Sequence, residues 1–401
     1  MGEQEALAAR KVVRSGALSA FFGSPGEFYN GGDQVRAFED EWAARFKVKH
    51  AISVNSATSG IMAAMGAIKI SPGDEVIVPP LTMSATVMAP LVYGGIPVFA
   101  DVEAETGCIS PSSVAAAITP LTRAIIAVNL FGHPARLQQL RALAKEKGIY
   151  LIEDNAQGLL AQEYSKLAGT IGDIGVFSLN YHKHIHTGEG GMCVTDDSEL
   201  ADRLRLIRNH GENAIEAYGI EDITNMIGFN WRLTELQAAI GRIQLQAIDE
   251  KVADRKRVAE RLSQRLINTP GIIVPRVRKG CKSAWYVWMA RIDTDAITVT
   301  RDVFSGQLTA EGIPHMAGYV QPLYMLPVFQ RRRAIGRDGW PFSLSKIRYS
   351  AGMCPVAERL TNILWFGIEM CRYDFPAHVV DQVADAIHNV FMAYASRHRQ
   401  H

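Results

Sequence analysis

Lys183 and Asp154 are the two residues in this sequence whose types and settings suggest covalent chemistry on a small molecule. Lys183 lies in a short polar loop between two predicted strands, Ile174 to Ser178 and Met192 to Thr195. A lysine fixed between strands can bring its amine to a carbonyl carbon in one geometry, as imine formation requires. A single loop lysine is far more often a solvated surface residue, so the segment before it has to be weighed with it.

Asp154 stands upstream, directly after the apolar segment Tyr150 to Glu153. This segment predicts a short buried strand, and ligands of open α/β sheets bind beyond the carboxyl ends of the strands. Pyridoxal phosphate needs a lysine that forms a Schiff base and a carboxylate that pairs with its protonated pyridine nitrogen. Taken alone, Asp154 is better explained as a cap for the segment that follows it.

Further motifs follow in an order and spacing that resemble a known family. They are NSATS at 55–59, VPPLT at 78–82, VNLFG at 128–132, IEDNAQ at 152–157, FS at 177–178 with Lys183, TGEGG at 187–191, NHG at 209–211 and GFNWR at 228–232. On these motifs the chain resembles the DegT/DnrJ/EryC1/StrS family of pyridoxal-phosphate-dependent sugar aminotransferases, of fold type I. The resemblance covers about Val35 to Phe329. It implies an α/β protein with a large, mostly parallel αβα sandwich domain and a smaller C-terminal α+β domain.

The resemblance implies a role for each matching residue. Pyridoxal 5′-phosphate would be bound covalently to Lys183, which would also be the general base of two half-reactions, with pyridoxamine 5′-phosphate between them. Asp154 would keep the ring nitrogen protonated, Gln157 would lie near the phenolic oxygen, and Ser178 would bind the phosphate. The implied cofactor-binding residues are Lys183, Asp154, Gln157, Ser178, Thr58, Ser59, Met83 and Asn230. No residue is expected to bind a metal ion.

The turn from the predicted strand Ala51 to Val54 into the predicted helix Ile61 to Ile68 gives separate support for a phosphate site. Small residues at such a turn let backbone amides face an anion at the start of a helix. The other interpretation is a simple N-cap formed by Ser56 or Thr58. Capping and phosphate binding can occur together.

Two positions qualify the resemblance. Met83 occupies a position that the family usually fills with an aromatic residue stacked on the cofactor ring; a thioether is polarizable enough to lie on a ring face. Asn230 is placed by the resemblance at the cofactor phosphate of a neighbouring subunit, which implies a homodimer with shared active sites. The alternative for Asn230 is that it only caps a long predicted helix, Thr234 to Leu262.

The substrates are also implied by the resemblance. An amino-acid donor, L-glutamate in this family, would aminate a keto-sugar, nucleotide-linked or free. The candidate substrate residues are His182, His315, Tyr319 and Arg331. Arg331, Arg332, Arg333 and Arg337 could meet the phosphates of an activated sugar, although a solvated surface run is the favoured interpretation of such a cluster.

Other functions within the same family remain open from the residues. A cyclitol or a sugar acid could be the acceptor, and the unusual loop from Gly318 to Arg333 suggests a less common subgroup. Family dehydratases carry histidine in place of the lysine, so Lys183 argues against that activity even though His182 and His184 flank it. A non-catalytic regulatory protein is disfavoured by the intact set of Lys183, Asp154 and Gln157.

Composition sets wider bounds. The chain has 401 residues, 48% hydrophobic and 21% charged, which is typical of a globular protein with room for two domains. A net charge of +1 gives no electrostatic case for nucleic acid. Five scattered cysteines without CxxC spacing indicate neither a disulfide framework nor a zinc site. Without an apolar run of about 18 residues or a signal-peptide core, a cytoplasmic protein and no membrane span are expected.

The order of predicted elements divides the chain. Strands alternate with helices as far as about residue 200, which predicts βαβ units and a mostly parallel sheet covered on both faces. This alternation is lost after about residue 255. We therefore expect an N-terminal arm at 1–34, a large cofactor-binding domain at 35–255 and a small C-terminal domain at 256–401. In the arm, residues 17–32 predict a loop over a groove or a subunit contact, and for the first dozen residues a loosely ordered tail is nearly as good an interpretation.

Overall fold

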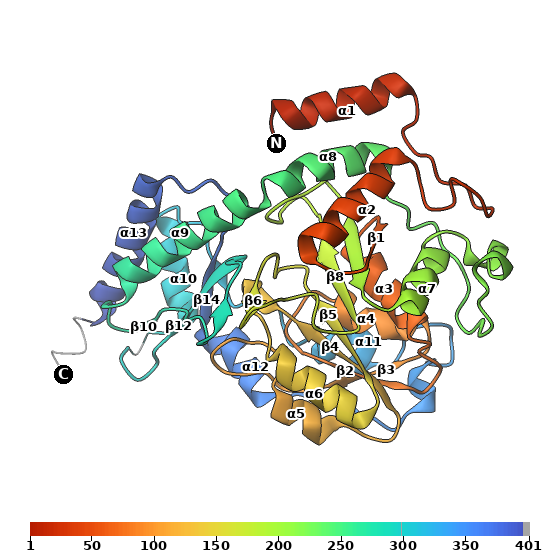
Figure 1. Cartoon of the computed structure of the whole chain (residues 1–401). Coiled ribbons are helices and arrows are strands. Elements are labelled where there is room, and N and C mark those ends of the chain that lie inside the picture. The colour runs from red at the N-terminus through yellow and green to blue at the C-terminus, as the bar shows by residue number, and fades with distance from the viewer. Residues whose placement is uncertain (298, 396–401) are drawn as a thin grey trace.

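A seven-stranded sheet forms the centre of the molecule in the computed structural model, which describes residues 1–297 and 299–395 (Figure 1). Its strands in spatial order are β1 (His50–Val54), β9 (Gly191–Thr195), β8 (Ile174–Ser178), β5 (Tyr150–Asp154), β4 (Thr122–Val128), β2 (Glu75–Val78) and β3 (Ile96–Phe99). Only β9 runs antiparallel to its neighbours. Every residue of β2 and β9 is buried, so helices or loops cover both faces. The predicted αβα sandwich is confirmed.

Helices of this domain begin and end within a few residues of the predicted positions. They are α2 (Asp33–Phe46), α3 (Ala57–Ala67), α5 (Pro111–Ala117), α6 (Leu137–Lys147) and α7 (Ser198–Arg208). The capping chemistry explains their ends: Ser56 caps the start of α3, and Gly148 closes α6 in the left-handed conformation with φ 66°. One further helix, α4 (Ala85–Val92), has no helical period in its sequence because it is apolar on every side and contains Pro90.

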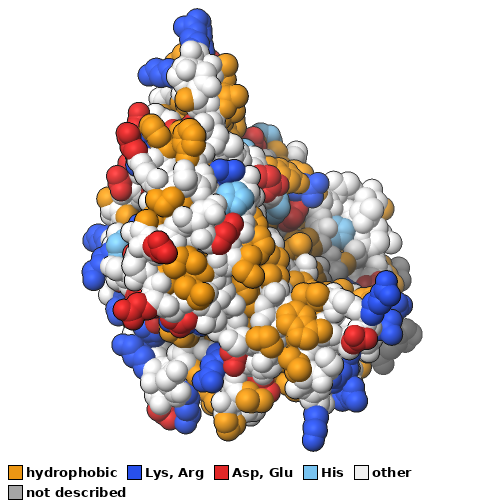
Figure 2. All heavy atoms as spheres, turned by 90° about the vertical axis from the view of Figure 1, so that its right-hand side faces the viewer, with side chains coloured by type: hydrophobic (Ala, Val, Ile, Leu, Met, Phe, Trp, Pro, Cys, Tyr) orange, Lys and Arg blue, Asp and Glu red, His pale blue; other side chains and the backbone are white. Residues whose placement is uncertain are grey.

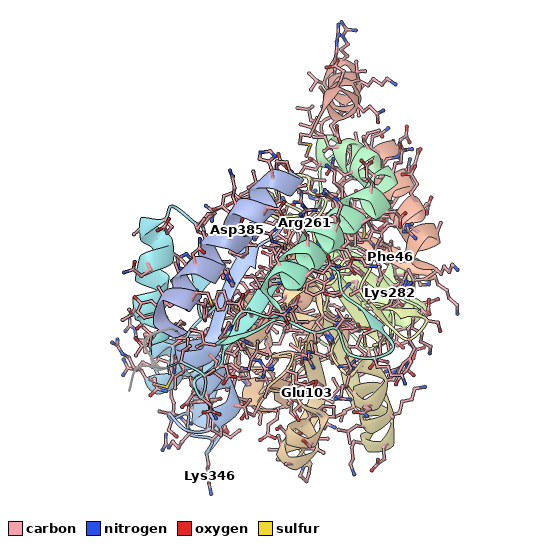
Figure 3. The ribbon with its side chains drawn as sticks, turned by 90° about the vertical axis from the view of Figure 1, so that its left-hand side faces the viewer. Phe46, Glu103, Arg261, Lys282, Lys346 and Asp385 are labelled. Atoms are coloured by element: carbon pink, nitrogen blue, oxygen red, sulfur yellow. The ribbon has the colours of Figure 1, made fainter. Side chains whose placement is uncertain are left out.

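A second, smaller sheet with its own helices lies beside this sandwich. Its antiparallel sheet has the order β10 (Ile272–Ile273), β12 (Val287–Ile292), β14 (Trp365–Glu369) and β13 (Met316–Ala317). Three helices share a separate hydrophobic core with it: α9 (Ile248–Leu266), α10 (Arg301–Ala310) and α13 (Ala377–Ala395). Figure 3 shows α9 and α13 side by side, with the labelled Arg261 and Asp385 on the two helices. A bidentate ion pair from Arg261 to Asp381 joins them at 2.6 and 2.8 Å.

The long helix predicted from Thr234 to Leu262 is in fact two helices. α8 (Glu235–Gln246) ends at Ala247, where φ −92° and ψ 5° interrupt the helical geometry, and α9 follows. The break lets α8 pack against α1 and α2 while α9 packs against α13. Because the sequence pattern is helical on both sides, only these separate packing partners reveal the bend.

The N-terminal dozen residues form a helix, α1 (Glu3–Ser15), that lies on α8 (Figure 1), so the loose-tail alternative is wrong. Acidic Glu3 and Glu5 in its first turn and Gly16 at its end, with φ 77°, are the sequence signals that could have found it. Residues 17–32 form a loop as predicted.

The predicted domain boundaries at 34 and 255 stay a prediction. The helix α9 passes through residue 255 without a break. Leu323, Tyr324, Phe329 and Phe342 pack into the core of the large sheet, although they follow that boundary in sequence. The remaining short strands and α-helices of the described chain are β6 (Gln162–Glu163), β7 (Lys166–Leu167), β11 (Cys281–Lys282), α11 (Pro327–Gln330) and α12 (Pro355–Arg359).

Within residues 1–297 and 299–395, no helix combines the length and apolarity needed to cross a membrane. The cytoplasmic location stays a prediction.

Candidate active site

A cavity of about 220 Å³ lies beyond the carboxyl ends of β5 and β8, where the topology of an α/β sheet predicts a ligand site. Residues from the two halves of the chain line it together. The predicted site residues among them are Lys183, Asp154, Gln157, Ser178, Thr58, Met83, His182 and Tyr319. The other lining residues that matter below are Tyr286, Asn180 and Glu189.

Lys183 presents its amine to this cavity. Its Nζ atom lies 4.3 Å from the ring centroid of Tyr286, and its backbone amide donates a hydrogen bond of 2.9 Å to the carbonyl of Asn180. Burial lowers the pKa of Lys183 to about 8, against an opposing attraction from Asp154. About a tenth of the amine is therefore unprotonated at pH 7, far more than for an ordinary lysine, and this is the form that a nucleophile or general base requires.

Asp154 is buried at the end of β5, with 4% of its surface exposed. Its Oδ2 atom accepts a 2.7 Å hydrogen bond from Thr86 Oγ1, and its Oδ1 atom accepts one of 3.1 Å from the amide of Ala156. Burial raises the pKa of this carboxyl, whereas the hydrogen bonds and Lys183 lower it. The capping interpretation is thus correct for one oxygen. Thr86 was missed because it lies in α4, which the sequence pattern does not reveal.

Gln157 is hydrogen-bonded to two aromatic residues at the cavity, to the backbone of one and to the side chain of the other. The amide of Phe131 donates to Gln157 Oε1 at 2.7 Å, and Gln157 Nε2 donates to the hydroxyl of Tyr319 at 3.0 Å. The Phe131 ring packs edge-on against the ring of Tyr319, with centroids 5.0 Å apart. These contacts fix the orientation of the Gln157 amide at the edge of the cavity.

An anion site can be recognised at the start of α3. Ser56 caps the helix by accepting the amide of Ser59 at 3.0 Å, while the amides of Ala57 and Thr58 have no acceptor within the described residues. Thr58 and Ser178 line the cavity beside them. Free amides and hydroxyls at a helix N-terminus are typical of a phosphate site. Ser59 instead donates its hydroxyl to Asn55 Oδ1 at 2.6 Å and does not line the cavity.

Gly191 allows β9 to approach this helix start. A Cβ atom at Gly191 would lie 2.7 Å from the Ala57 amide nitrogen and the Ser56 carbonyl carbon, so any side chain would push the two segments apart.

We expect Gly191→Ala to lower stability by about 1–3 kcal/mol, because the added methyl overpacks a backbone contact, and to weaken cofactor binding. Urea unfolding and an absorbance titration with pyridoxal phosphate measure the two effects. Gly306→Ala in α10 is the matched control, since a Cβ there meets nothing within 4 Å. Equal cofactor affinity in both variants would contradict the assigned anion site.

Four predicted residues do not line this cavity: Ser59, Asn230, His315 and Arg331. Asn230 is exposed, and its Oδ1 atom accepts from Arg232 at 2.7 Å. It does not cap α8, because Thr234 does so together with Gln237. His315 is hydrogen-bonded to Ser305 and to the carbonyl of Ile313.

The arginine cluster of the long loop is divided between surface and structure. Arg331, Arg333 and Arg337 are exposed, which agrees with the solvated-run interpretation. Arg332 donates to the carbonyls of Phe342, Ser345 and Ile347 and so fixes the loop. Arg332 is therefore not free to bind a substrate phosphate.

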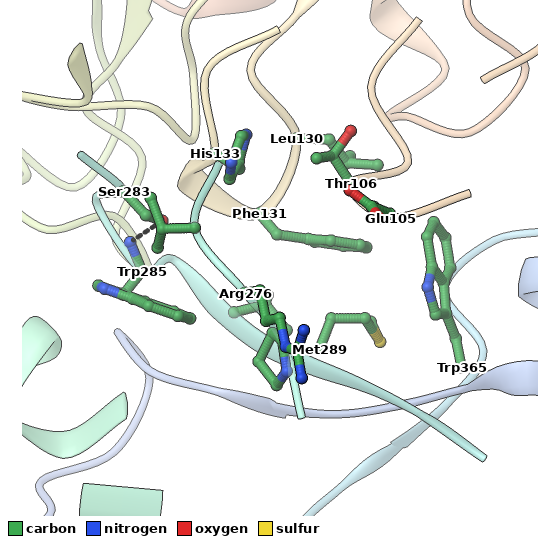
Figure 4. A pocket seen from close by; sticks show the side chains of 13 residues that line it. Glu105, Thr106, Leu130, Phe131, His133, Arg276, Ser283, Trp285, Met289 and Trp365 are labelled. Atoms are coloured by element: carbon green, nitrogen blue, oxygen red, sulfur yellow. Dashed lines mark hydrogen bonds between the residues drawn. The ribbon is translucent and has the colours of Figure 1, made fainter. Parts of the chain in front are cut away.

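A second cavity lies behind Phe131, between the two cores (Figure 4). Trp365, Met289 and Trp285 surround it, and Arg276 lies at its edge. Its volume of about 30 Å³ is enough for a water molecule and too small for a sugar. This small cavity is therefore not a candidate substrate site.

The buried carboxylate, the lysine of lowered pKa and the helix-start anion site fit the ring nitrogen, aldehyde and phosphate of pyridoxal phosphate. Fold and site together define a pyridoxal-phosphate-dependent aminotransferase of fold type I. Comparison with known sequences gives the family. The chain belongs to the DegT/DnrJ/EryC1/StrS aminotransferase family, which it matches over residues 22–346. This is a family of sugar aminotransferases.

Several relatives are similar over most of their length. The spore coat polysaccharide biosynthesis protein SpsC of Bacillus subtilis is 32% identical over 86% of this chain and 87% of its own. The dTDP-3-amino-3,4,6-trideoxy-alpha-D-glucose transaminase of Streptomyces venezuelae is 35% identical, over 74% and 76%. Among solved structures, an aminotransferase from Psychrobacter cryohalolentis superposes with a TM-score of 0.85 at 28% identity, covering 98% of both chains. DesV of S. venezuelae, solved in complex with a ketimine intermediate, gives 0.81 at 29%, over 96% and 94%.

Proposed function

We propose that this enzyme moves an amino group from an amino acid, L-glutamate by family resemblance, to a keto-sugar. The proposal rests on one observation above the others. The lowered-pKa amine of Lys183 and the buried carboxylate of Asp154 face one cavity at the ends of neighbouring strands. Relatives such as GDP-perosamine synthase of Caulobacter vibrioides, 34% identical over 73% of this chain and 77% of its own, support a nucleotide-linked sugar.

Each residue has a defined task in this proposal. Pyridoxal phosphate supplies an electron sink that stabilises negative charge at the donor's α-carbon. Lys183 holds the cofactor covalently and, once displaced, carries the proton away from that carbon. Asp154 keeps the ring nitrogen protonated. Gln157 would lie near the phenolic oxygen, and Thr58, Ser178 and the start of α3 would hold the phosphate.

The lining also restricts the acceptor. Lys183 is the only lysine or arginine among the lining residues that the structure describes. Tyr319, His182 and Met83 instead offer aromatic, imidazole and thioether surfaces, which suit an uncharged sugar ring. A cyclitol would suit the same surfaces. A sugar acid, like the L-glutamate donor itself, would need a cationic partner for its carboxylate from outside this lining. The phosphates of a nucleotide would have to bind outside this part of the site.

The cofactor-loaded enzyme provides the test. L-Glutamate alone should convert the yellow, lysine-bound form into pyridoxamine phosphate, and a GDP- or dTDP-linked keto-sugar should restore it. Mass spectrometry should then find the amino-sugar. If glutamate and other amino acids all leave the spectrum unchanged, aminotransfer is refuted. Restoration only by a keto-cyclitol would support the alternative acceptor.

We infer further that the enzyme is a homodimer with shared active sites. Asn230, predicted to reach a neighbouring phosphate, is exposed and lies outside the cavity of its own chain. Large apolar side chains are exposed at Phe22, Met83, Ile223 and Ile227, each with more than 60% of its surface accessible. Figure 2 shows several groups of exposed apolar side chains, with charged ones among them, on the face that it presents. An exposed apolar patch of this kind favours contact with a second copy.

Mixing two inactive variants tests the shared site. Lys183→Ala lacks the reactive amine, and Asn230→Asp places a negative charge near the partner's cofactor phosphate. In a mixed dimer, one of the two sites would combine an intact Lys183 with an intact Asn230. Random exchange should therefore restore roughly one quarter of wild-type activity.

Native mass spectrometry is the control, because it confirms that subunits have exchanged. If both residues act within one chain, every site in the mixture keeps a lesion and no activity returns. That outcome, with mixed dimers present, would end the shared-site proposal.

A further inference from the structure

We propose that Tyr286 is a positioning residue for Lys183: the face of its ring holds the protonated amine between reaction steps without taking the proton. This inference rests on Lys183 being the reactive lysine of the proposed function. It extends that function by adding a residue to which neither the sequence motifs nor the comparisons assign a role.

The contact itself is direct. Lys183 Nζ lies 4.3 Å from the Tyr286 ring centroid, well within the range of a cation–π interaction. The ammonium makes no hydrogen bond or ion pair within the described residues, so no such bond replaces its contact with the ring there. Tyr286 is only 7% exposed, which strengthens the interaction because little water competes for the cation.

Backbone contacts on both sides hold Tyr286 in place. Its amide donates to the carbonyl of Phe131 at 3.0 Å, and its carbonyl accepts from the amide of Met370 at 3.1 Å. Gly132 makes the first contact possible, because a Cβ there would lie 2.7 Å from the Trp285 nitrogen and 2.9 Å from that of Tyr286. The ring position is therefore fixed by two separate segments of the chain.

The loop that carries Lys183 is tied to the same segment. His184 Nε2 donates to the carbonyl of Ala284 at 2.7 Å. Burial lowers the pKa of His184 to about 4, so the imidazole is neutral near pH 7. Lys183 is next to His184 in sequence, and Tyr286 is two residues from Ala284. This hydrogen bond therefore helps to fix the position of Lys183 relative to Tyr286.

Other charged groups also act on the ammonium and must be separated from the ring. Asp154 attracts it from β5, and Glu369 attracts it from the end of β14. Other titratable neighbours are His182 and His184 on its own loop, Cys371 beyond β14, and Glu189 and Tyr319 in the lining of the same cavity. A change that removes the ring's face and keeps all of these groups isolates the contribution of Tyr286.

The Tyr286 ring can stabilise the protonated Lys183 amine without competing for its protons. A carboxylate at the same position would hydrogen-bond the ammonium and compete for its protons. An aromatic face attracts the cation through its quadrupole and accepts no proton, so the N–H bonds of Lys183 remain available to the substrate. Removing the face should disfavour the protonated amine and lower the pKa of Lys183 by about 0.4–1.5 units.

Competitive acetylation with peptide mass spectrometry measures that pKa in the full-length protein without cofactor. The rate of Lys183 acetylation is followed from pH 6 to pH 11, roughly spanning the usual lysine range. We expect Tyr286→Phe to keep the wild-type pKa, because it keeps the ring, and Tyr286→Leu to lower it. Tyr319→Phe is the matched control, since it removes a neighbouring hydroxyl and no ring.

Fluorinated phenylalanines at position 286 keep the proposal testable if the leucine variant unfolds. Each added fluorine weakens the negative face of the ring with little change in shape, so the pKa of Lys183 should fall stepwise along the series. An unchanged pKa across the series, or an equal fall in Tyr286→Phe, would overturn the proposal. Because no substrate or turnover enters the measurement, its failure is distinct from failure of the proposed function.

Discussion

Replacing Lys183 with alanine is expected to lower transamination about 10⁴-fold or more, because the variant loses both the covalent attachment and the proton-transfer group. The chain should still fold, because Lys183 lies in a loop and is not part of the hydrophobic cores. Single-turnover absorbance with L-glutamate is the measurement. Near wild-type conversion in the variant would refute the assignment of Lys183.

The same variant has a stability signature that does not depend on turnover. Burial lowers the pKa of Lys183 from 10.5 to about 8, so between these values the unfolded chain binds more protons than the folded one. The stability of the cofactor-free protein should therefore rise with pH across this window. Lys183→Ala should lose that part of the slope, whereas the exposed-lysine control Lys166→Ala should keep both the slope and the activity.

Asp154→Asn is expected to bind cofactor and to react at least ~100-fold more slowly, because an amide cannot keep the ring nitrogen protonated and the electron sink weakens. The structure predicts that folding survives, because the amide oxygen can still accept from the backbone of Ala156 while the amide NH2 donates to the Thr86 hydroxyl, which can turn to accept. Stopped-flow rates at saturating L-glutamate, corrected for cofactor occupancy, test this.

The exposed Asp338 provides the matched control for this change, and Asp338→Asn should leave the rate unaltered. If Asp154→Asn reacts at the wild-type rate with full cofactor occupancy, the carboxylate is only the cap of the segment at Ala156. The electron-sink assignment would then be wrong, although the covalent role of Lys183 would stand.

Much of the fold follows from local pattern. Alternating strands and helices, the cap at Ser56 and the left-handed Gly148 carry their signals within a few residues, so these elements could be predicted. The break at Ala247 and the helix α4 could not, because tertiary packing decides each of them. Long-range contacts also placed four later residues in the core of the large sheet, Leu323, Tyr324, Phe329 and Phe342.

The sequence by itself determined the chemistry of the site: an isolated loop lysine, a carboxylate at a strand end and the motifs that join them. These signals are readable because catalytic residue types at strand ends stand out against an apolar pattern. Only the tertiary structure decided which neighbours act on them. Thr86 meets Asp154 across 68 residues, and Tyr286 meets Lys183 across the two sheets. Such contacts depend on how separate segments pack, and no local spacing records that.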